Sequence, residues 1–413
     1  MADLFDTTID WLLAQALSDD PLSVTVQGLA TRLLDGGVPL ARLSLGRALL
    51  HPVIGLLNIQ WDRDSGDIKS EAVPRASVLA ELEVKNPFTD LGEDGVTSII
   101  ANLKDPADVA RYAIFGKLAA QGITGYAAFG LIYGRKQKLF FEMPQHQRGR
   151  SENFRGASLS FATKRFSGFS QSDLEGLERL VPAICVCARV DTDRFMVNDV
   201  LETYLGRVSG NRVLTGQIDR NDLQQIECAL FYSDMHASLA LSQQLDAQTY
   251  LDTVNAYFDC TANAVLDHGG EVLKFIGDGI LAIFPIEPGT RPRDNMCTAA
   301  LAAAREAFAR ADHANTLRGD QKLPPVNFGV ALHVGEVIYG NVGIEKRLDF
   351  TATGPQVGLA ARIEGLTRTL NAPILASEAF AAHVSETGTI HPAQQVRSFD
   401  QPITVVGYPL NPS

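Results

Sequence analysis

Two aspartates in the second half of this sequence stand where acids could do chemistry. Residues 228–233 (CALFYS) form an apolar run of strand length, and Asp234 follows it directly. An acid at the end of a buried strand is either a helix N-cap or a metal ligand. Asp278 lies between two glycines, in a turn that joins two strand-like segments within residues 271–284 and is typical of a β-hairpin. Taken alone, a hairpin turn accounts for Asp278.

These aspartates belong to a series of short motifs. In chain order the motifs are Phe231-x-Ser-Asp234, Gly269-Gly-x-x-x-Lys274-Phe-x-Gly-Asp278, Gly329-Val-Ala-Leu-His333-x-Gly335-Glu-Val-x-x-Gly340-Asn-x-Gly343, Asp349-x-Thr351-x-x-Gly354 and Leu359-Ala-Ala-Arg362-Ile-Glu364. Over residues 221–410 the series resembles the catalytic domain of class III adenylate and guanylate cyclases. Several motifs in one order are far more specific than any one of them alone. Residues 201–214 also resemble the segment that precedes such domains in bacterial cyclases.

The resemblance implies a lyase that converts ATP to 3′,5′-cyclic AMP and pyrophosphate. The ribose 3′-oxygen must attack the α-phosphorus, which requires neutralised phosphate charge and a lowered pKa for the attacking hydroxyl. Two divalent cations, Mg²⁺ or Mn²⁺, held by paired carboxylates would supply both. By the family pattern these carboxylates are Asp234 and Asp278. Backbone N–H groups just after Asp234, at a helix start, would help to hold the phosphates.

Selection of the base falls, by similarity, to Lys274 and Thr351. A lysine can donate to the N1 edge of adenine, and the Thr351 hydroxyl can accept from the adenine amino group. Guanylate cyclases have Glu at the position of Lys274, so the resemblance favours ATP over GTP. Arg362, on a helix expected to begin near Gln356, would stabilise charge on the transferring phosphoryl group. Arg397 is a candidate for a triphosphate contact, and an exposed strand end is an equal alternative.

Three positions depart from the family pattern. Residues 235–239 (MHASL) replace the usual Arg-Gly-Phe-Thr segment, Pro355 replaces a frequent Asp, and Gly358 replaces an Asn that orients the ribose. Gly358 matters most, because a poorly held attacking oxygen reacts slowly. An alternative function is therefore a degenerate cyclase that binds nucleotide and acts as a regulatory or dimerisation module.

The first part of the chain shows no catalytic motif. Residues 25–190 resemble a GAF-type sensor domain in architecture, with no heme or metal ligand pair, since His51 and His146 are isolated. The expected strands are 123–133, 138–143 and 158–164. We expect a sensor domain at 1–171 with an unknown ligand, a helical transducer at 172–220 and a cyclase domain at 221–413.

The transducer begins with a predicted capping box of Ser172 and Glu175. Apolar residues then recur at alternating steps of three and four, as in a coiled-coil seam: Leu174, Leu177, Val181, Ile184 and Ala188. Pro182 should kink this helix, and a second helical segment is expected at 195–205. The seam indicates either a terminal helix packed on its own domain or a signalling helix that pairs with its twin in a dimer.

Composition restricts the class of protein. The chain has 413 residues, 46% of them apolar and 20% charged, as in globular proteins. Its net charge of −12 argues against a non-specific nucleic-acid binder, which needs a basic face. The N-terminus lacks a basic signal-peptide region, and no apolar run approaches the roughly 20 residues that span a bilayer. Five sparse cysteines suit reduced, buried thiols, and we expect a cytoplasmic protein.

The predicted fold class is α/β (α+β), with a ferredoxin-like βαββαβ core in the cyclase domain. The resemblance implies a head-to-tail homodimer in which Asp234 and Asp278 come from one subunit and Lys274, Thr351 and Arg362 from the other. A diguanylate cyclase is disfavoured, because residues 269–272 (GGEV) imitate its GGDEF turn poorly. A P-loop kinase or ATPase is disfavoured as well, since no GxxxxGK[ST] motif occurs.

Overall fold

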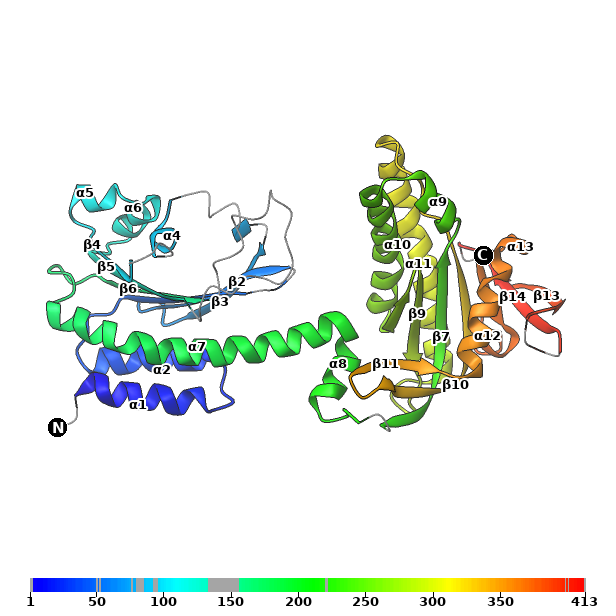
Figure 1. The fold of residues 1–413 in the computed structure, drawn as a ribbon, viewed down its shortest axis with the longest axis horizontal. Coiled ribbons are helices and arrows are strands. Elements are labelled where there is room, and N and C mark those ends of the chain that lie inside the picture. Colours follow the sequence, from blue (N-terminus) through cyan, green and yellow to red (C-terminus); the bar gives the residue numbers. More distant parts are fainter. Residues whose placement is uncertain are drawn as a thin grey trace. The chain divides into compact units, whose positions relative to one another are not determined.

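A computed structural model describes residues 3–49, 51, 53–75, 77–78, 85–91, 96–132, 156–219, 222–397, 399 and 401–411. The chain divides into two compact units, residues 1–200 and 201–413 (Figure 1). None of the described helices combines the length and the apolar character that a membrane crossing requires. All five cysteines are buried, as the sequence analysis predicts.

The first unit is built on an antiparallel sheet. Within the described residues its strand order is β3-β2-β1-β6-β5-β4. The strands are β1 (Arg42–Ala48), β2 (Ile54–Asp62), β3 (Ile68–Pro74), β4 (Ser98–Asn102), β5 (Gly125–Ile132) and β6 (Gly156–Thr163). The predicted strands at 123–133 and 158–164 are thus confirmed to within two residues, apart from residue 133. The expected strand at 138–143, residue 133 and His146 lie outside the described residues.

Helices cover both faces of this sheet (Figure 1). They are α1 (Leu4–Ala16), α2 (Leu22–Asp35), α4 (Pro87–Asp90), α5 (Pro106–Val109), α6 (Ala113–Ala120) and α7 (Gln171–Leu205). One apolar core joins α1, α2 and α7 to the sheet through residues such as Leu12, Leu29, Phe161 and Ile184. A second core, around Phe115 of α6, lies on the opposite face.

Helix α7 corrects two expectations about the transducer. It runs without interruption from Gln171 to Leu205 and includes Pro182, so the predicted division into two helical segments is wrong. The capping box uses Ser170 and Asp173, whose side chains accept from each other's backbone N–H groups at 3.2 and 2.8 Å. The predicted Ser172–Glu175 box is wrong because the helix begins at Gln171, which makes Ser170 the N-cap.

The second unit holds a larger sheet of mixed direction. Within the described residues its strand order is β13-β14-β12-β10-β7-β9-β8, and β11 pairs with β10. The strands are β7 (Leu223–Met235), β8 (Glu271–Ile276), β9 (Gly279–Pro285), β10 (Phe328–Ile344), β11 (Arg347–Thr353), β12 (Ile374–Ser377), β13 (Thr389–Gln394) and β14 (Ile403–Tyr408).

The helices of the second unit are α8 (Arg207–Leu214), α9 (Ser238–Gln244), α10 (Ala247–Asp267), α11 (Arg293–Asp320), α12 (Pro355–Glu364), α13 (Leu366–Thr369) and α14 (Glu378–Ala381). Helices α10 and α11 cover one face of the sheet (Figure 1) and form the main core with it. The other face carries a smaller core with residues from β8, β9, β10, β11 and α12, to which Val213 of α8 adds a partly buried side chain. The predicted strand at 228–233, the hairpin at 271–284 and the helix near 356 are all confirmed.

Candidate active site

The sheet register brings the two predicted aspartates side by side. Strands β7 and β9 pair antiparallel, with Asp234 opposite Gly279. The Met235 N–H donates to the Asp278 carbonyl at 3.1 Å, which anchors the hairpin tip to β7. A Cβ placed on Gly279 would lie 2.9 Å from Oδ1 of Asp234, so this position has room only for glycine. Two carboxylates distant in sequence therefore lie at one place.

Alternation along β7 determines which way Asp234 faces. Ser233 points to the α10 side, where its Oγ accepts from the buried Tyr257 hydroxyl at 2.9 Å. Asp234 therefore faces the opposite side of the sheet. It is not a helix N-cap, since α9 begins at Ser238 and its N-cap is Ala237. Of the two possible roles of Asp234, helix N-cap and metal ligand, the N-cap is thus excluded.

One detail of the predicted phosphate contact is wrong. The N–H groups of Met235 and His236, directly after Asp234, already donate to the carbonyls of Asp278 and Asn327. These two groups are occupied because the chain stays paired in the sheet past Asp234 before it turns into α9. Any backbone contact to phosphate from this segment must begin at Ala237 or later.

Burial and repulsion act together on Asp234. Its partial burial, the neighbouring Asp278 carboxylate and the Glu364 carboxylate raise the pKa of Asp234 to about 6, while Arg368 and His236 oppose the rise. Glu364 is buried, and its Oε1 lies 3.8 Å from Nε2 of His236. The sequence analysis assigned no role to Glu364, Arg368 or His236, although Glu364 is the last residue of the motif that contains Arg362.

The carboxylate pair fits divalent cations. Oxygen ligands are those that Mg²⁺ prefers, and it is commonly held by one or two carboxylates together with substrate phosphates. A cation between Asp234 and Asp278 would remove the repulsion that raises the pKa of Asp234. Across the part of the chain that the structure describes, no group of three or more His, Cys, Asp or Glu side chains is placed to hold a metal.

A second cluster gathers around Lys274. The pairing of β8 with β9 shifts register between Val272 and Lys274, which is a β-bulge. After this shift Lys274 lies opposite Leu281, on the face that β11 covers. There its ammonium forms an ion pair with Asp349 of β11. Thr351 lies two residues further along β11, on the same strand face and half-buried.

Asp349 begins the motif that contains Thr351, but the sequence analysis assigned it no function. Residues two apart on a strand share a face, so the spacing of Asp349 and Thr351 was the available indication that the two side chains lie together. The structure thus pairs Lys274 with a carboxylate on the strand face of β11 that also carries Thr351.

The two predicted arginines differ in their surroundings. Arg362 is exposed on α12, close enough to Tyr232 for its positive charge to lower the pKa of that phenol, although burial of Tyr232 raises this pKa overall. The start of α12 is held by Gln356, whose Oε1 lies 2.7 Å from Nε2 of the buried His333. Arg397 is exposed in the turn after β13, and among the described residues no contact joins it to the other predicted site residues.

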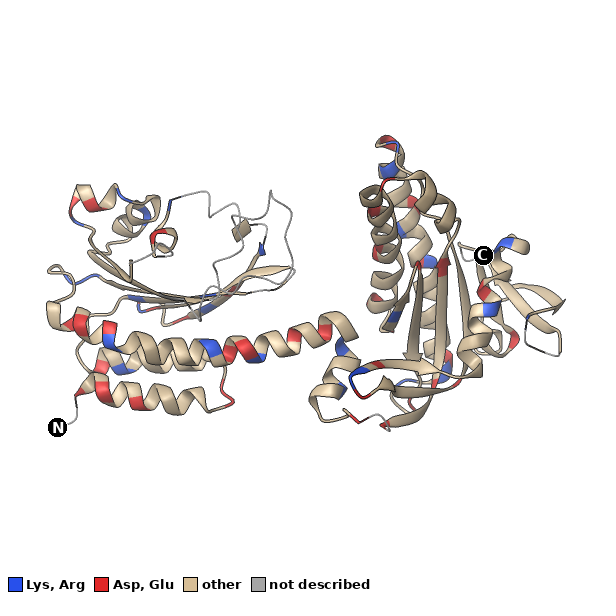
Figure 2. Cartoon of the chain, viewed as in Figure 1, with Lys and Arg blue, Asp and Glu red and all other residues tan. Residues whose placement is uncertain are grey.

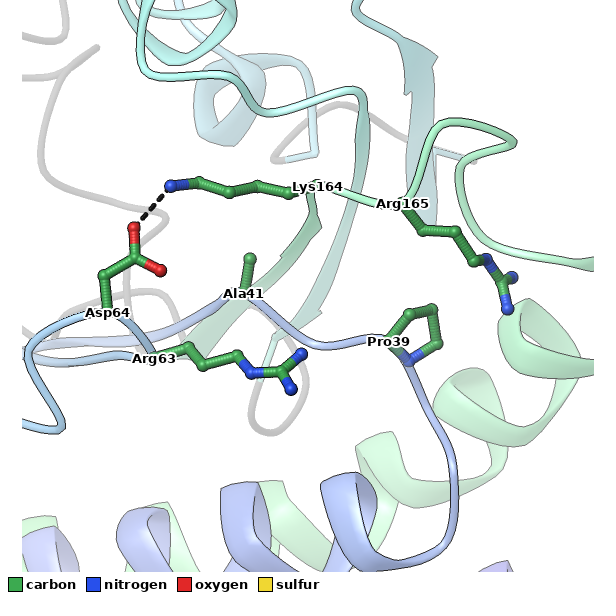
Figure 3. A pocket seen from close by; sticks show the side chains of 6 residues that line it. All are labelled: Pro39, Ala41, Arg63, Asp64, Lys164 and Arg165. Atoms are coloured by element: carbon green, nitrogen blue, oxygen red, sulfur yellow. Dashed lines mark hydrogen bonds and ion pairs between the residues drawn. The ribbon is translucent and has the colours of Figure 1, made fainter.

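A separate pocket lies at one end of the sheet in the first unit. It has a volume of about 370 Å³ and is lined by Pro39, Ala41, Arg63, Asp64, Lys164 and Arg165 (Figure 3). Lys164 pairs with Asp64 at 2.5 Å, and Arg165 pairs with Asp173 at 2.6 Å. Most of its positive charge is therefore already neutralised, and the pocket gives no indication of a particular ligand.

Comparison with known proteins finds similarity for part of the chain. Residues 222–383 match the model of the adenylate and guanylate cyclase catalytic domain. An adenylate cyclase of Anabaena cylindrica is 29% identical over 160 residues, which cover 38% of this chain and 30% of that protein. An uncharacterised protein of Mycobacterium tuberculosis is 32% identical over 222 residues, which cover 52% of this chain and 36% of that protein.

Among solved structures, the adenylyl cyclase CyaB from P. aeruginosa is 24% identical to the chain with a TM-score of 0.39. The match covers 45% of this chain and 94% of that one. The chain spans well under half of the length of the two curated relatives.

Proposed function

We propose that the cyclase-type catalytic domain in this chain converts ATP to 3′,5′-cyclic AMP and pyrophosphate. The observation that supports this best is the pairing of Asp234 with Gly279, which brings the Asp234 and Asp278 carboxylates together beside the hairpin that also carries Lys274. The family model covers adenylate and guanylate cyclases alike, so the choice of ATP rests on Lys274 and Thr351.

Each group has a role in this proposal. Asp234 and Asp278 would hold two divalent cations, which would supply positive charge to neutralise the phosphates and lower the pKa of the ribose 3′-hydroxyl. Lys274 donates to the adenine N1 edge, and Thr351 accepts from the adenine amino group. Arg362 donates to the phosphate oxygens as negative charge builds on them during attack at the α-phosphorus. Arg397 stays a weaker candidate for a triphosphate contact.

The proposed active form is a homodimer with composite sites. Exposed apolar side chains on β8 and β10 support a contact with a second copy: Phe275, Ile276, Ile338, Val342 and Ile344 are each between 41 and 64% exposed. Within one chain, Lys274 pairs with Asp349 of β11, while Asp234 pairs with the tip of the hairpin. This separation fits two half-sites that are completed by a partner subunit.

The architecture around the site is proposed as follows. The C-terminal unit has a ferredoxin-like core, which the order β7, α10, β8, β9, α11, β10 supports. The first unit is a GAF-like sensor domain, which its antiparallel sheet and the three helices on one face support. The proposed parts are a sensor at 1–171, a transducer at 172–220 and a catalytic domain at 221–413. A cytoplasmic location stays a prediction.

A second candidate function is a degenerate cyclase that binds nucleotide without turnover. Gly358 favours it, because this exposed position on α12 offers no side chain to orient the ribose.

One assay separates the two functions. The full chain is incubated with ATP or GTP and Mg²⁺ or Mn²⁺, and 3′,5′-cyclic product and pyrophosphate are measured, with Asp278→Asn as the control. Cyclic AMP formed by the wild type and not by the variant supports the adenylate cyclase. Nucleotide binding without any cyclic product supports the degenerate cyclase.

A further inference from the structure

Three buried polar side chains from separate segments meet in the C-terminal unit. They are Ser209 of α8, Glu271 at the start of β8 and Tyr339 of β10, and all are at most 5% exposed. The hydroxyls of Ser209 and Tyr339 both donate to Oε1 of Glu271, at 2.8 and 2.9 Å. Oε2 of Glu271 is buried without a hydrogen-bond partner among the described residues. We refer to these three residues as the Glu271 cluster.

The Glu271 cluster is an energetically unfavourable arrangement for a protein core. A buried carboxylate is costly unless it is paired with charge and fully hydrogen-bonded, and here it receives two neutral hydroxyls. A positive group, the guanidinium of Arg212, lies over the Tyr339 ring at 4.7 Å from its centroid, and no ion pair joins it to Glu271 among the described residues. Apolar side chains of similar volume would be more stable. The arrangement does, however, specify one relative position for α8, β8 and β10, because any slip would leave further polar atoms unpaired.

Two glycines allow α8 to reach the cluster. Gly206, the N-cap of α8, has a φ of 83° that side chains rarely tolerate, and a Cβ there would lie 3.2 Å from the carbonyl of Val272 in β8. Gly210 packs against the backbone of Leu201 and Glu202, where a Cβ would lie 3.0 Å from the Leu201 carbonyl. Helix α8 therefore packs against the end of α7 and directly beside β8.

The cluster touches both strands that carry the predicted base-selecting residues. Glu271 begins β8, three residues before Lys274. Tyr339 packs edge to face on Phe350 of β11, with ring centroids 4.9 Å apart, and Phe350 stands between Asp349 and Thr351. The aspartate pair is anchored differently, through the Met235 N–H and strand β7. A change in the cluster should therefore move the base subsite more than the carboxylate pair.

We infer that Glu271 is a positioning residue for the nucleobase subsite, and that through Ser209 it makes the geometry of Lys274 and Thr351 depend on the position of helix α8. This inference rests on the proposed function for the identity of the nucleotide, but the coupling of α8 to β8 and β11 does not. Displacement of α8 would weaken base binding and base selection without removing the groups that act on the phosphates.

Single hydroxyl deletions test this. Ser209→Ala and Tyr339→Phe each remove one donor to Glu271 and keep the shape of the core. The matched control is Tyr257→Phe, which removes an equally buried hydroxyl that bonds to Ser233 of β7 instead. The three measurements are hydrogen–deuterium exchange of residues 271–276 and 347–353, binding of α,β-methylene-ATP and its guanine counterpart with Mn²⁺, and KM and kcat for ATP.

We expect both cluster variants to exchange faster in these two segments and to bind the adenine analogue about tenfold more weakly, as for a lost hydrogen bond to a charged group. Their adenine-to-guanine preference should fall, with kcat within about twofold of the wild type, and Tyr257→Phe should change neither binding nor preference. Unchanged exchange and binding, or losses equal to those of Tyr257→Phe, would overturn the inference. If the wild type forms no cyclic product, the proposed function fails, while exchange and analogue binding still decide the inference.

Discussion

At the residue scale, the site combines side chains that repel each other with one position that lacks a side chain. Asp234 and Asp278 lie together with Glu364 nearby, and this negative charge is tolerated only partly, as the raised pKa of Asp234 shows. Gly358 lies one helical turn before Arg362 on α12, so a side chain at 358 would share its face. We therefore expect substitution to change activity in opposite directions at the two places, with a loss at Asp234 and a gain at Gly358.

Replacing Gly358 by Asn should speed cyclisation. A Cβ at Gly358 would meet no atom within 4 Å, so the side chain fits, and an amide here could hold the ribose for attack. We expect the rate of cyclic AMP formation to rise by about tenfold, because orientation of the attacking oxygen is improved. Gly319→Asn is the matched control, since Gly319 is also an exposed helical glycine with open space around it. An equal rate in wild type and Gly358→Asn would contradict this role for position 358.

Replacing Asp234 by Asn should remove activity and raise stability at neutral pH. Because the pKa of folded Asp234 is raised to about 6 from 3.8, the folded state holds this proton more tightly than the unfolded chain. The resulting stabilisation is present below about pH 4 and is lost as pH rises through 6. At pH 7.5 without metal, the variant should be more stable by about 1 kcal/mol, after discounting for solvent screening of a half-buried group.

Denaturant unfolding at pH 4 and pH 7.5 tests the predicted direction of this change in stability. The gain of Asp234→Asn over the wild type should be present at pH 7.5 and vanish at pH 4. Asp312→Asn, at an exposed position on α11, serves as the control. A variant that is less stable than the wild type at pH 7.5 would show that Asp234 is not strained by its neighbours.

At the scale of elements, α7 changes character along its length. Its buried residues end at Ala188, and Figure 2 shows that charged residues are absent from its middle and present toward its C-terminal end. Beyond Ala188, buried polar side chains of the first unit contact the helix. Arg47 pairs with Asp191, and His51 pairs with Asp199. Nδ1 of His51 accepts from the N–H groups of Val53 and Ile54 at 3.1 and 2.8 Å, so the proton on this ring is at Nε2, facing Asp199.

Replacing Asp199 by Ala should loosen the end of α7. The buried Nε2 of His51 would lose the carboxylate that lies beside it, and the loss of such a polar contact to a buried group costs about 1–3 kcal/mol. We expect faster hydrogen–deuterium exchange in residues 195–205, with residues 174–188 unchanged because their apolar packing remains. Asp193→Ala, at a position of α7 that is 70% exposed, is the control. Equal exchange in the two variants would mean that the His51 contact does not hold the helix.

At the scale of the whole molecule, the proposal requires two chains. In a composite dimer each site is built from one half of each subunit. A site is therefore active only when both of its halves are intact. The two classes of site residue therefore make different predictions when variants are combined.

Co-expression of Asp278→Asn with Lys274→Ala should restore activity. Heterodimers keep one site in which both halves are intact, so a statistical mixture should reach about a quarter of wild-type activity. Asp278→Asn combined with Asp234→Asn should stay inactive, because both changes damage the same half. A mixture of the first kind that is no more active than its components would rule out shared sites.

The sequence by itself determined the secondary structure around the site, because strand alternation, glycine turns and amphipathic helices are local properties. The strand at 228–233 and the hairpin at 271–284 follow from such patterns, and the motif series indicated the resemblance that the match of residues 222–383 to the cyclase model repeats. The start and continuity of α7 were missed, since two serines compete for the cap and tertiary packing carries the helix through Pro182. Only the tertiary structure decided that Asp234 is no N-cap, that Asp349 joins Lys274 and that Glu271 is buried beneath α8. These facts depend on contacts between residues far apart in the chain, which local pattern does not encode.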